Sequence, residues 1–429
     1  MMDGILAIGL LFTTSSQFRV PGLPVGPGEM CLAIWIAGKF AQILVSGAPA
    51  RSPAVSVLVA YWGIFALALS LGMLTALATG EAFEPGLVLH DTVAYPFVAV
   101  MSYFCAATPS RASRVGWYVA IGGAASLGAQ FANGMGLINV PGIDPWFWER
   151  FRGWSSNPNQ LSILCGVVLL VALHLADTAA NLRMRLVAIG CMIPAFVLGR
   201  MSQSDTFTLA VVAALPVWCV GKLFVWLTTD QPEPSPRASL AWLGLLTTPV
   251  LLLSLAPLAL SQAGGTQDFV RVVAKNNGTE AAGETKLRMT LWRQAIARGV
   301  ESGLLGLGPG PHLQIPAEVV AGRESNSQLT NIEHPTQNGT ANFEAHNTML
   351  DLFTQGGLLA VVSFTGLLMR ATASAWRARS AGLMALMIGA MIFIVTGNIV
   401  RQPIFWFAIV LCLTARNVVP SSRALMRSI

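Results

Sequence analysis

Long apolar runs constrain this chain more than any other feature of its sequence. Hydrophobic residues make up 54% of its 429 residues and charged residues only 11%, whereas a soluble domain carries about a quarter charged residues. Many of the runs approach the roughly 20 residues that an α-helix needs to cross a bilayer. A helix satisfies its backbone hydrogen bonds internally, which lipid requires. The sequence therefore predicts an all-α polytopic membrane protein.

About twelve apolar stretches are predicted to be transmembrane helices. They lie near residues 3–18, 28–46, 53–79, 91–108, 115–137, 158–176, 185–200, 206–228, 239–261, 346–369, 381–399 and 402–416. The first nine form an N-terminal bundle over residues 1–261, a partly helical periplasmic loop domain follows over 262–345, and the last helices and a cytoplasmic tail occupy 346–429. The first stretch lacks a clear cleavage site, so we expect it to be an uncleaved first helix.

Arginines are unevenly divided between the two sets of connections that this arrangement creates. The richer set, with the C-terminal tail, contains Arg51, Arg111, Arg114, Arg183, Arg185, Arg237, Arg370, Arg377, Arg379, Arg416, Arg423 and Arg427. The short connections of the poorer set contain Arg19, Arg150, Arg152, Arg200 and Arg401. The positive-inside rule then places both termini in the cytoplasm and the long loop outside. The net charge of +6 thus sets topology, and we expect no nucleic-acid partner.

The polar residues offer no pattern for a metal or a cofactor. All six cysteines lie in apolar runs without paired spacing, which disfavours both disulfides and zinc. There is no His-x-x-x-His pair, no Walker A loop, no GxGxxG dinucleotide turn and no nucleophilic serine elbow. The glycine run 306–310 does not follow a strand, so we interpret it as a sharp turn. We expect neither a metal nor a cofactor.

Residues 285–301 are predicted to form a basic amphipathic helix within the long loop, with Leu287, Leu291, Ala295 and Ile296 as its apolar stripe. Arg288 and Trp292 lie one turn apart on one face. A guanidinium binds phosphate oxygens in pairs and stays charged at any relevant pH. Arg293 and Arg298 fit a solvated helix face better than a phosphate contact.

His346 stands where the long loop gives way to an apolar helix, and Asn347 follows it at once. A histidine titrates near neutral pH and can accept a proton from an attacking hydroxyl. A single histidine at a membrane interface is more often structural, so its chemistry alone leaves both roles open.

A tryptophan-rich segment at residues 139–160 also has two interpretations. Its aromatic side chains suit the membrane interface, where amphipathic rings settle. Alternatively, Arg150, Arg152 and the Asn157-Pro158-Asn159 turn border a site that they share with the long loop.

Three segments of the chain, by their sequence and their order, resemble the O-antigen ligase and polymerase family of bacterial surface-polysaccharide assembly. Arg288 and Trp292 precede a glycine turn at residues 305–310, as in that family. His346-Asn347 is followed by a Gly-Gly pair at 356–357, and Asn157-Pro158-Asn159 is similar to the family's NPN segment that opens a central helix. The resemblance covers roughly residues 150–365.

The resemblance implies a GT-C-like, metal-independent, inverting glycosyltransferase of the bacterial inner membrane. Its donor would be a glycan linked to undecaprenyl diphosphate, and its acceptor a hydroxyl of a second glycan or of lipid A-core. Arg288 would hold the diphosphate and His346 would assist the acceptor hydroxyl. The substrate-binding residues expected from the resemblance and the chemistry are Arg200, Trp292, Arg293, Asn347, Asn157 and Asn159.

One position departs from the family pattern. The family has a Ser-Arg pair where this chain has Ser204-Asp205. Arg200, one turn earlier, would supply the missing charge, or the second phosphate contact is absent. This leaves a structural protein without activity as one alternative.

The other alternative is a flippase or other transporter of lipid-linked sugars. Such a protein is expected to carry intramembrane charges facing a cavity, and often two repeated halves. The sequence contains no evident internal repeat, and we expect only Lys39 and Lys222 to be buried, both near helix ends. These features favour the glycosyltransferase over the transporter.

Overall fold

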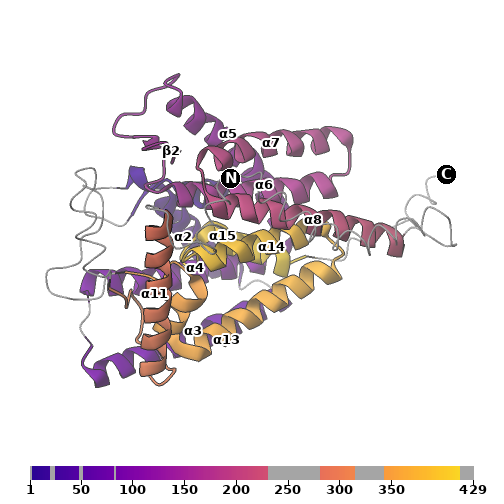
Figure 1. The fold of residues 1–429 in the computed structure, drawn as a ribbon. Coiled ribbons are helices and arrows are strands. Elements are labelled where there is room, and N and C mark those ends of the chain that lie inside the picture. Colours follow the sequence, from indigo (N-terminus) through magenta and orange to yellow (C-terminus); the bar gives the residue numbers. More distant parts are fainter. Residues whose placement is uncertain are drawn as a thin grey trace.

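A computed structural model describes residues 2–19, 25–47, 52–81, 84–229, 281–314 and 343–415, with side chains described from residue 287 onward in the fifth of these segments. Most of this part of the chain, 78%, is helical (Figure 1). The helices are α1 (Met2–Phe12), α2 (Pro27–Ser46), α3 (Pro53–Thr79), α4 (Pro85–Ala107), α5 (Pro109–Gly134), α6 (Pro158–Thr178), α7 (Leu182–Met201), α8 (Asp205–Thr229), α11 (Ala281–Glu301), α13 (Thr348–Arg377), α14 (Ala381–Thr396) and α15 (Pro403–Leu413).

Smaller elements occupy two connections. A 3-10 turn (Ser16–Phe18) follows α1. An antiparallel hairpin, β1 (Trp146–Phe147) and β2 (Arg150–Phe151), lies between α5 and α6. Proline at the start of helices such as α3 and α6 explains several of these boundaries, because its fixed φ and missing N–H suit the first helical turn.

Seven described helices are long and apolar enough to cross a membrane, namely α2, α3, α4, α6, α7, α8 and α13. The all-α membrane fold is therefore confirmed, while the expected count of twelve spans is not. The helices α1, α14 and α15 are apolar but only 11, 16 and 11 residues long, and α5 is less apolar. The predicted span at residues 239–261 and the residues 262–280 of the loop lie outside the described residues.

The core lies where the C-terminal helices enter the N-terminal bundle. Every residue of α15 is buried, and 78% of the most apolar part of α6 is buried, against 22% for α8. In Figure 1 the yellow helices α14 and α15 lie between α8 and α13. Outer helices such as α2 and α3 instead expose large apolar side chains, Leu44 and Leu74 among them, as expected for a surface that faces lipid.

The helix connections gather at two ends of the bundle. At one end, Asp3 of α1 lies 3.7 Å from Arg111 and 3.4 Å from Arg114 at the start of α5. At the other end, Arg150 of the hairpin donates to the carbonyl of Ser202, the residue after α7 (3.1 Å). This grouping agrees with the predicted alternation of connections; which end faces the cytoplasm stays a prediction of the positive-inside rule.

The two lysines expected to be buried with their charged ends reaching toward the helix ends differ in the structure. Lys39 is buried, with 6% of its surface exposed. Lys222 is exposed and pairs with Asp177 at 2.6 Å, because a side chain near the end of α8 reaches out of the bundle. The sequence interpretation also missed Asp91, which is fully buried.

Candidate functional site

Helix α11 packs across the bundle at the N-terminal end of α13. Figure 1 shows it running across α3 and α13 rather than alongside them. Its buried face consists of Leu287, Leu291 and Ala295, which pack against Leu313 and Ala345. The predicted apolar stripe is confirmed, except for its fourth member.

That fourth member, Ile296, is 51% exposed. The buried residues repeat every four positions, which places Ile296 just outside the contact face. Trp292 lies at the edge of this face, half-buried, and its Nε1–H donates to the Ala345 carbonyl at 3.0 Å. Through this bond α11 contacts the residue immediately before His346.

The residues around His346 are fixed individually. Phe343 exchanges two backbone hydrogen bonds with Leu313, at 3.1 and 3.0 Å. The Ala345 N–H donates to Asp351 Oδ1 at 2.7 Å. Asn347 caps α13, its Oδ1 accepting from the N–H groups of the second and third helical residues at 3.0 and 3.3 Å. The segment is therefore held from both sides of His346.

His346 itself has a left-handed backbone, with φ of 51°. A residue other than glycine seldom adopts this conformation, and where it occurs the surrounding structure enforces it. Its side chain is exposed, with the ring edge-on to that of Phe343 at 5.1 Å between centroids. A titratable imidazole is thus presented on a rigid piece of backbone.

The three arginines of α11 differ in their surroundings. Arg288 and Arg293 are exposed. Arg288 lies four residues before Trp292, about 6 Å along the helix axis, which places its backbone close to the contact with Ala345. Arg298 instead forms an ion pair with Glu81 at 2.5 Å. This pair holds the end of α11 against the end of α3.

The glycine turn after α11 is confirmed as a turn. Gly306, Gly308 and Gly310 have φ values of 82°, 88° and 112°, a backbone region that favours glycine. The N–H of Gly308 donates to the Gln355 carbonyl at 2.8 Å. These residues are therefore occupied with packing against α13.

The Gly-Gly pair of α13 meets that turn. The backbone of α13 is non-helical at Gly356 and Gly357. A Cβ on Gly357 would lie 2.0 Å from the Leu304 carbonyl oxygen, and one on Gly72 of α3 would lie 2.4 Å from that of Gln355. Glycine is needed at these positions because three backbones approach closely.

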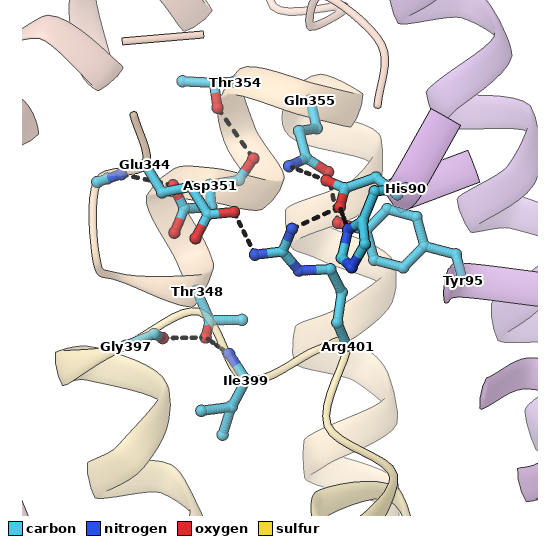
Figure 2. A network of polar contacts seen from close by, with 12 residues as sticks. His90, Tyr95, Glu344, Thr348, Asp351, Thr354, Gln355, Gly397, Ile399 and Arg401 are labelled. Carbon is cyan, nitrogen blue, oxygen red and sulfur yellow. Dashed lines mark hydrogen bonds and ion pairs between the residues drawn. The ribbon is translucent and has the colours of Figure 1, made fainter. Parts of the chain in front are cut away.

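An ionic network centred on the buried Asp91, with half-buried partners, lies behind the His346 segment (Figure 2). Arg401, in the turn between α14 and α15, pairs with Asp91 of α4 at 2.5 Å and with Glu344. His90 Nδ1 lies 3.0 Å from the same Asp91 carboxylate. Burial acts to lower the pKa of Arg401, but the Glu344 and Asp91 carboxylates outweigh it and raise that pKa, so the guanidinium remains charged.

Further hydrogen bonds tie this network to α13. Gln355 donates to Asp91 at 3.4 Å and accepts from the Tyr95 hydroxyl at 2.6 Å. Thr348 donates to the Gly397 carbonyl at 2.5 Å and accepts from the Ile399 N–H at 3.1 Å. These bonds fix the turn that carries Arg401 against the start of α13.

A second group of expected site residues lies around the hairpin. Asn157 caps α6, its Oδ1 accepting from the Asn159 N–H at 2.8 Å. Asn159 Oδ1 accepts from Arg150 at 3.2 Å. Arg200 is exposed and donates to the Thr208 hydroxyl at 2.5 Å. Through Arg150, which also contacts Ser202, this group includes the turn between α7 and α8, where Asp205 begins α8.

The contacts named above do not join the two groups. Trp292, His346 and Asn347 belong to the first, with Arg288 and Arg293 exposed on the same helix as Trp292. Asn157, Asn159 and Arg200 belong to the second. Within the described ranges, no group of three His, Cys, Asp or Glu side chains is placed to hold a metal ion.

The sequence interpretation missed Asp91, Glu344 and Arg401 as a unit. One pattern pointed to them: Asp91 begins a predicted apolar helix, and a carboxylate at membrane depth is costly without a cationic partner. The residue that pairs with it lies 310 positions away, and no local spacing reveals such a distance.

Comparison with known proteins does not identify a family. No family model, no curated protein and no solved structure matches the chain. The site must therefore be judged on its chemistry. The exposed His346 can accept a proton, and the exposed arginines of α11, the helix that contacts the His346 segment through Trp292, can hold an anion.

Proposed function

We propose that this protein is a membrane glycosyltransferase that transfers glycan from undecaprenyl diphosphate to an acceptor hydroxyl on the periplasmic side. The observation that supports it best is the exposed His346, held in a left-handed conformation directly after Ala345, the residue that Trp292 of α11 contacts; the exposed Arg288 lies one turn before Trp292 on that helix. The order of segments that resembles the O-antigen ligase and polymerase family points the same way.

In the proposed reaction His346 accepts the proton of the acceptor hydroxyl. The oxygen attacks the anomeric carbon of the donor sugar, and the bond from that carbon to the diphosphate oxygen breaks with inversion. The leaving diphosphate keeps the electron pair, and Arg288 stabilises its charge. A diphosphate already leaves readily, so one weak base and fixed positive charge are sufficient, and no metal is required.

The other expected residues have supporting roles. Trp292 positions α11 through its bond to Ala345, and Asn347 positions His346 by capping α13. Arg293 is available for the glycan or the diphosphate because it is exposed. Arg200, Asn157 and Asn159 would contact the substrate from the hairpin side of the same end.

Glycan transfer by purified protein tests this proposal. The protein is placed in vesicles with an undecaprenyl-diphosphate-linked glycan and an acceptor glycan or lipid A-core. Replacing His346 by alanine is expected to lower the transfer rate about 10²- to 10⁴-fold, the usual contribution of a general base. Arg288→Gln is expected to lower it as well.

The matched control is Arg183→Gln, because Arg183 is an exposed arginine at the start of α7, at the opposite end of the bundle. It is expected to transfer at the wild-type rate. Transfer by the His346→Ala protein at the wild-type rate would refute the assignment.

The surface-polysaccharide profile of a strain that lacks the gene distinguishes the two acceptors. Single repeats on lipid or core, without long polymer, indicate a polymerase. Full-length polymer that accumulates on undecaprenyl diphosphate indicates a ligase. A transporter would instead leave polymer or its precursor on the cytoplasmic side, and purified protein would transfer nothing.

A further inference from the structure

A group of cations lies at the end of the bundle opposite His346, between α1, α2 and α5. Arg111 and Arg114 share the single carboxylate of Asp3, at 3.7 and 3.4 Å. Lys39 of α2 lies in the same pocket as Asp3 and Arg111 and is 6% exposed. Three positive side chains therefore gather around one carboxylate.

The hydrogen bond and the ring contact of the Lys39 ammonium group are both to neutral side chains, while Asp3 and Arg111 act on it from across the pocket. Its Nζ lies 3.3 Å from Gln42 Oε1 and 5.7 Å from the centre of the Trp35 ring. Among the ion pairs of the described residues, none gives Lys39 a carboxylate. A charge taken out of water is costly unless an opposite charge compensates it. The pocket therefore favours an anion.

The surroundings of the pocket are apolar. Leu6, Trp35, Val115 and Phe407 line it beside the charged groups. Further along α2, at the same end, Leu44 and Val45 are 86% and 87% exposed. An anion attached to hydrocarbon chains would satisfy both surfaces, whereas a free phosphate would satisfy only the charged one.

We propose that this pocket binds the headgroup phosphate of an anionic phospholipid, with its acyl chains against the exposed face of α2. Arginine suits this role because its guanidinium matches phosphate oxygens in pairs. Basic pockets between transmembrane helices bind anionic headgroups on the cytoplasmic side. In the predicted orientation this pocket faces the cytoplasmic leaflet. The site is independent of the glycan-transfer site.

Lipid binding to the purified protein tests the proposal. The full chain in neutral detergent is titrated with phosphatidylglycerol, and binding is followed by native mass spectrometry and by the melting temperature. Wild type is expected to bind phosphatidylglycerol and to melt at a higher temperature with it. Phosphatidylcholine, whose headgroup has no net charge, is expected to produce neither effect.

The variants isolate the cations. Arg111→Gln with Arg114→Gln is expected to weaken phosphatidylglycerol binding about tenfold or more, since both charge-assisted contacts to the phosphate are lost. Lys39→Met removes the buried charge while keeping most of the length of the side chain, and is expected to weaken binding too. The matched control is Arg183→Gln with Arg185→Gln, two exposed arginines at the same end, which is expected to bind as wild type does.

Four outcomes would overturn the proposal. They are equal binding of both lipids by wild type, undiminished binding by the Arg111 and Arg114 variant, an equal loss in the Arg183 and Arg185 control, and displacement of the lipid by inorganic phosphate at the same concentration. The last outcome would indicate a free-anion site. If the double glutamine variant does not fold, two other variants replace it in the test: Lys39→Met, and Arg111→Lys combined with Arg114→Lys, which preserves both charges. The double lysine variant is expected to retain most of the lipid binding.

Discussion

Arg401 shows how a single side chain connects distant parts of this molecule. Its guanidinium joins Asp91 in α4 to Glu344, two residues before His346. Asp91 is fully buried, so its carboxylate depends on this partner. We infer that Arg401 is a positioning residue for His346, because Glu344 begins the segment that carries the histidine.

The first prediction concerns the loss of this partner. Replacing Arg401 by methionine is expected to destabilise the protein by about 3–5 kcal/mol, since it leaves a buried carboxylate uncompensated. Adding Asp91→Asn is expected to recover part of that loss, because the uncompensated charge is then removed. Chemical unfolding in detergent measures both variants. If Asp91→Asn instead lowers the free energy of unfolding further, the two residues are not coupled as described.

His312 provides the second prediction at this scale. It is buried after the glycine turn, and its Nε2 lies 2.8 Å from the Gly308 carbonyl, to which the neutral ring donates. Burial lowers the pKa of this imidazole below its ordinary value of 6.5. Below about pH 6.5 this histidine is protonated to a greater extent in the unfolded chain than in the folded chain. The free energy of unfolding therefore decreases as the pH drops below about 6.5.

The measurement is the free energy of unfolding between pH 7.5 and 5.5. Wild type is expected to lose up to about 1.4 kcal/mol per pH unit from this group in the acidic part of the range. His312→Gln is expected to show a smaller loss. Parallel curves for wild type and His312→Gln would contradict the argument.

At the scale of elements, the close approach of three backbones determines how the polar loop meets the bundle. The turn at residues 304–310, the kink of α13 and Gly72 of α3 contact one another without side chains between them. This explains the glycine motifs as packing requirements. The glycine run 306–310, interpreted from the sequence as a sharp turn, packs against the backbone of α13 and α3.

The third prediction tests that junction. Gly357→Ala is expected to destabilise the protein by more than about 1–2 kcal/mol, because a left-handed backbone penalises any Cβ and the Leu304 carbonyl oxygen lies 2.0 Å from its position. Gly366→Ala, on the same helix with open space around it, is expected to be neutral or to stabilise by about 0.5–1 kcal/mol. Thermal unfolding in detergent compares the two. Equal stability of both variants would show that the junction tolerates a side chain.

The same scale shows what the sequence could and could not predict. The apolar runs predicted most helices, because lipid and protein interior select the same residues. The stripe of α11 was also predictable, since its period is local. The end of α14 was not: the predicted span 381–399 stops at Thr396, before the turn that brings Arg401 to Asp91. Helix α15 ends at Leu413, short of the predicted 416.

At the candidate site, the sequence predicted the residues but not the contacts that fix their positions. His346, Asn347 and Trp292 were chosen for their chemistry and their order, and the contacts of Trp292 with Ala345 bring them together. The choice of Arg288 rests on helical spacing alone. The Asp91–Arg401 pair could not be derived, because its stabilisation depends on folding across 310 positions rather than on neighbouring residues.

For the whole molecule, the remaining question is which end faces the cytoplasm. The arginine distribution predicts that the end with Asp3, Arg111 and Arg183 does, and that the end with the hairpin and His346 faces outward. Both proposals depend on this orientation: glycan on undecaprenyl diphosphate must reach His346 from outside, and the lipid pocket lies in the inner leaflet.

Cysteine labelling in whole cells tests the orientation and is the fourth prediction. In a background with the accessible Cys31 and Cys219 replaced by alanine, a cysteine is introduced at the exposed Asn139 before the hairpin or at the exposed Arg183 before α7. A maleimide that cannot cross the inner membrane is expected to label Asn139→Cys in spheroplasts, and Arg183→Cys only after the membrane is permeabilised. The reverse pattern would invert the topology, because one end of this bundle cannot face both sides, and it would place His346 where no periplasmic transfer is possible.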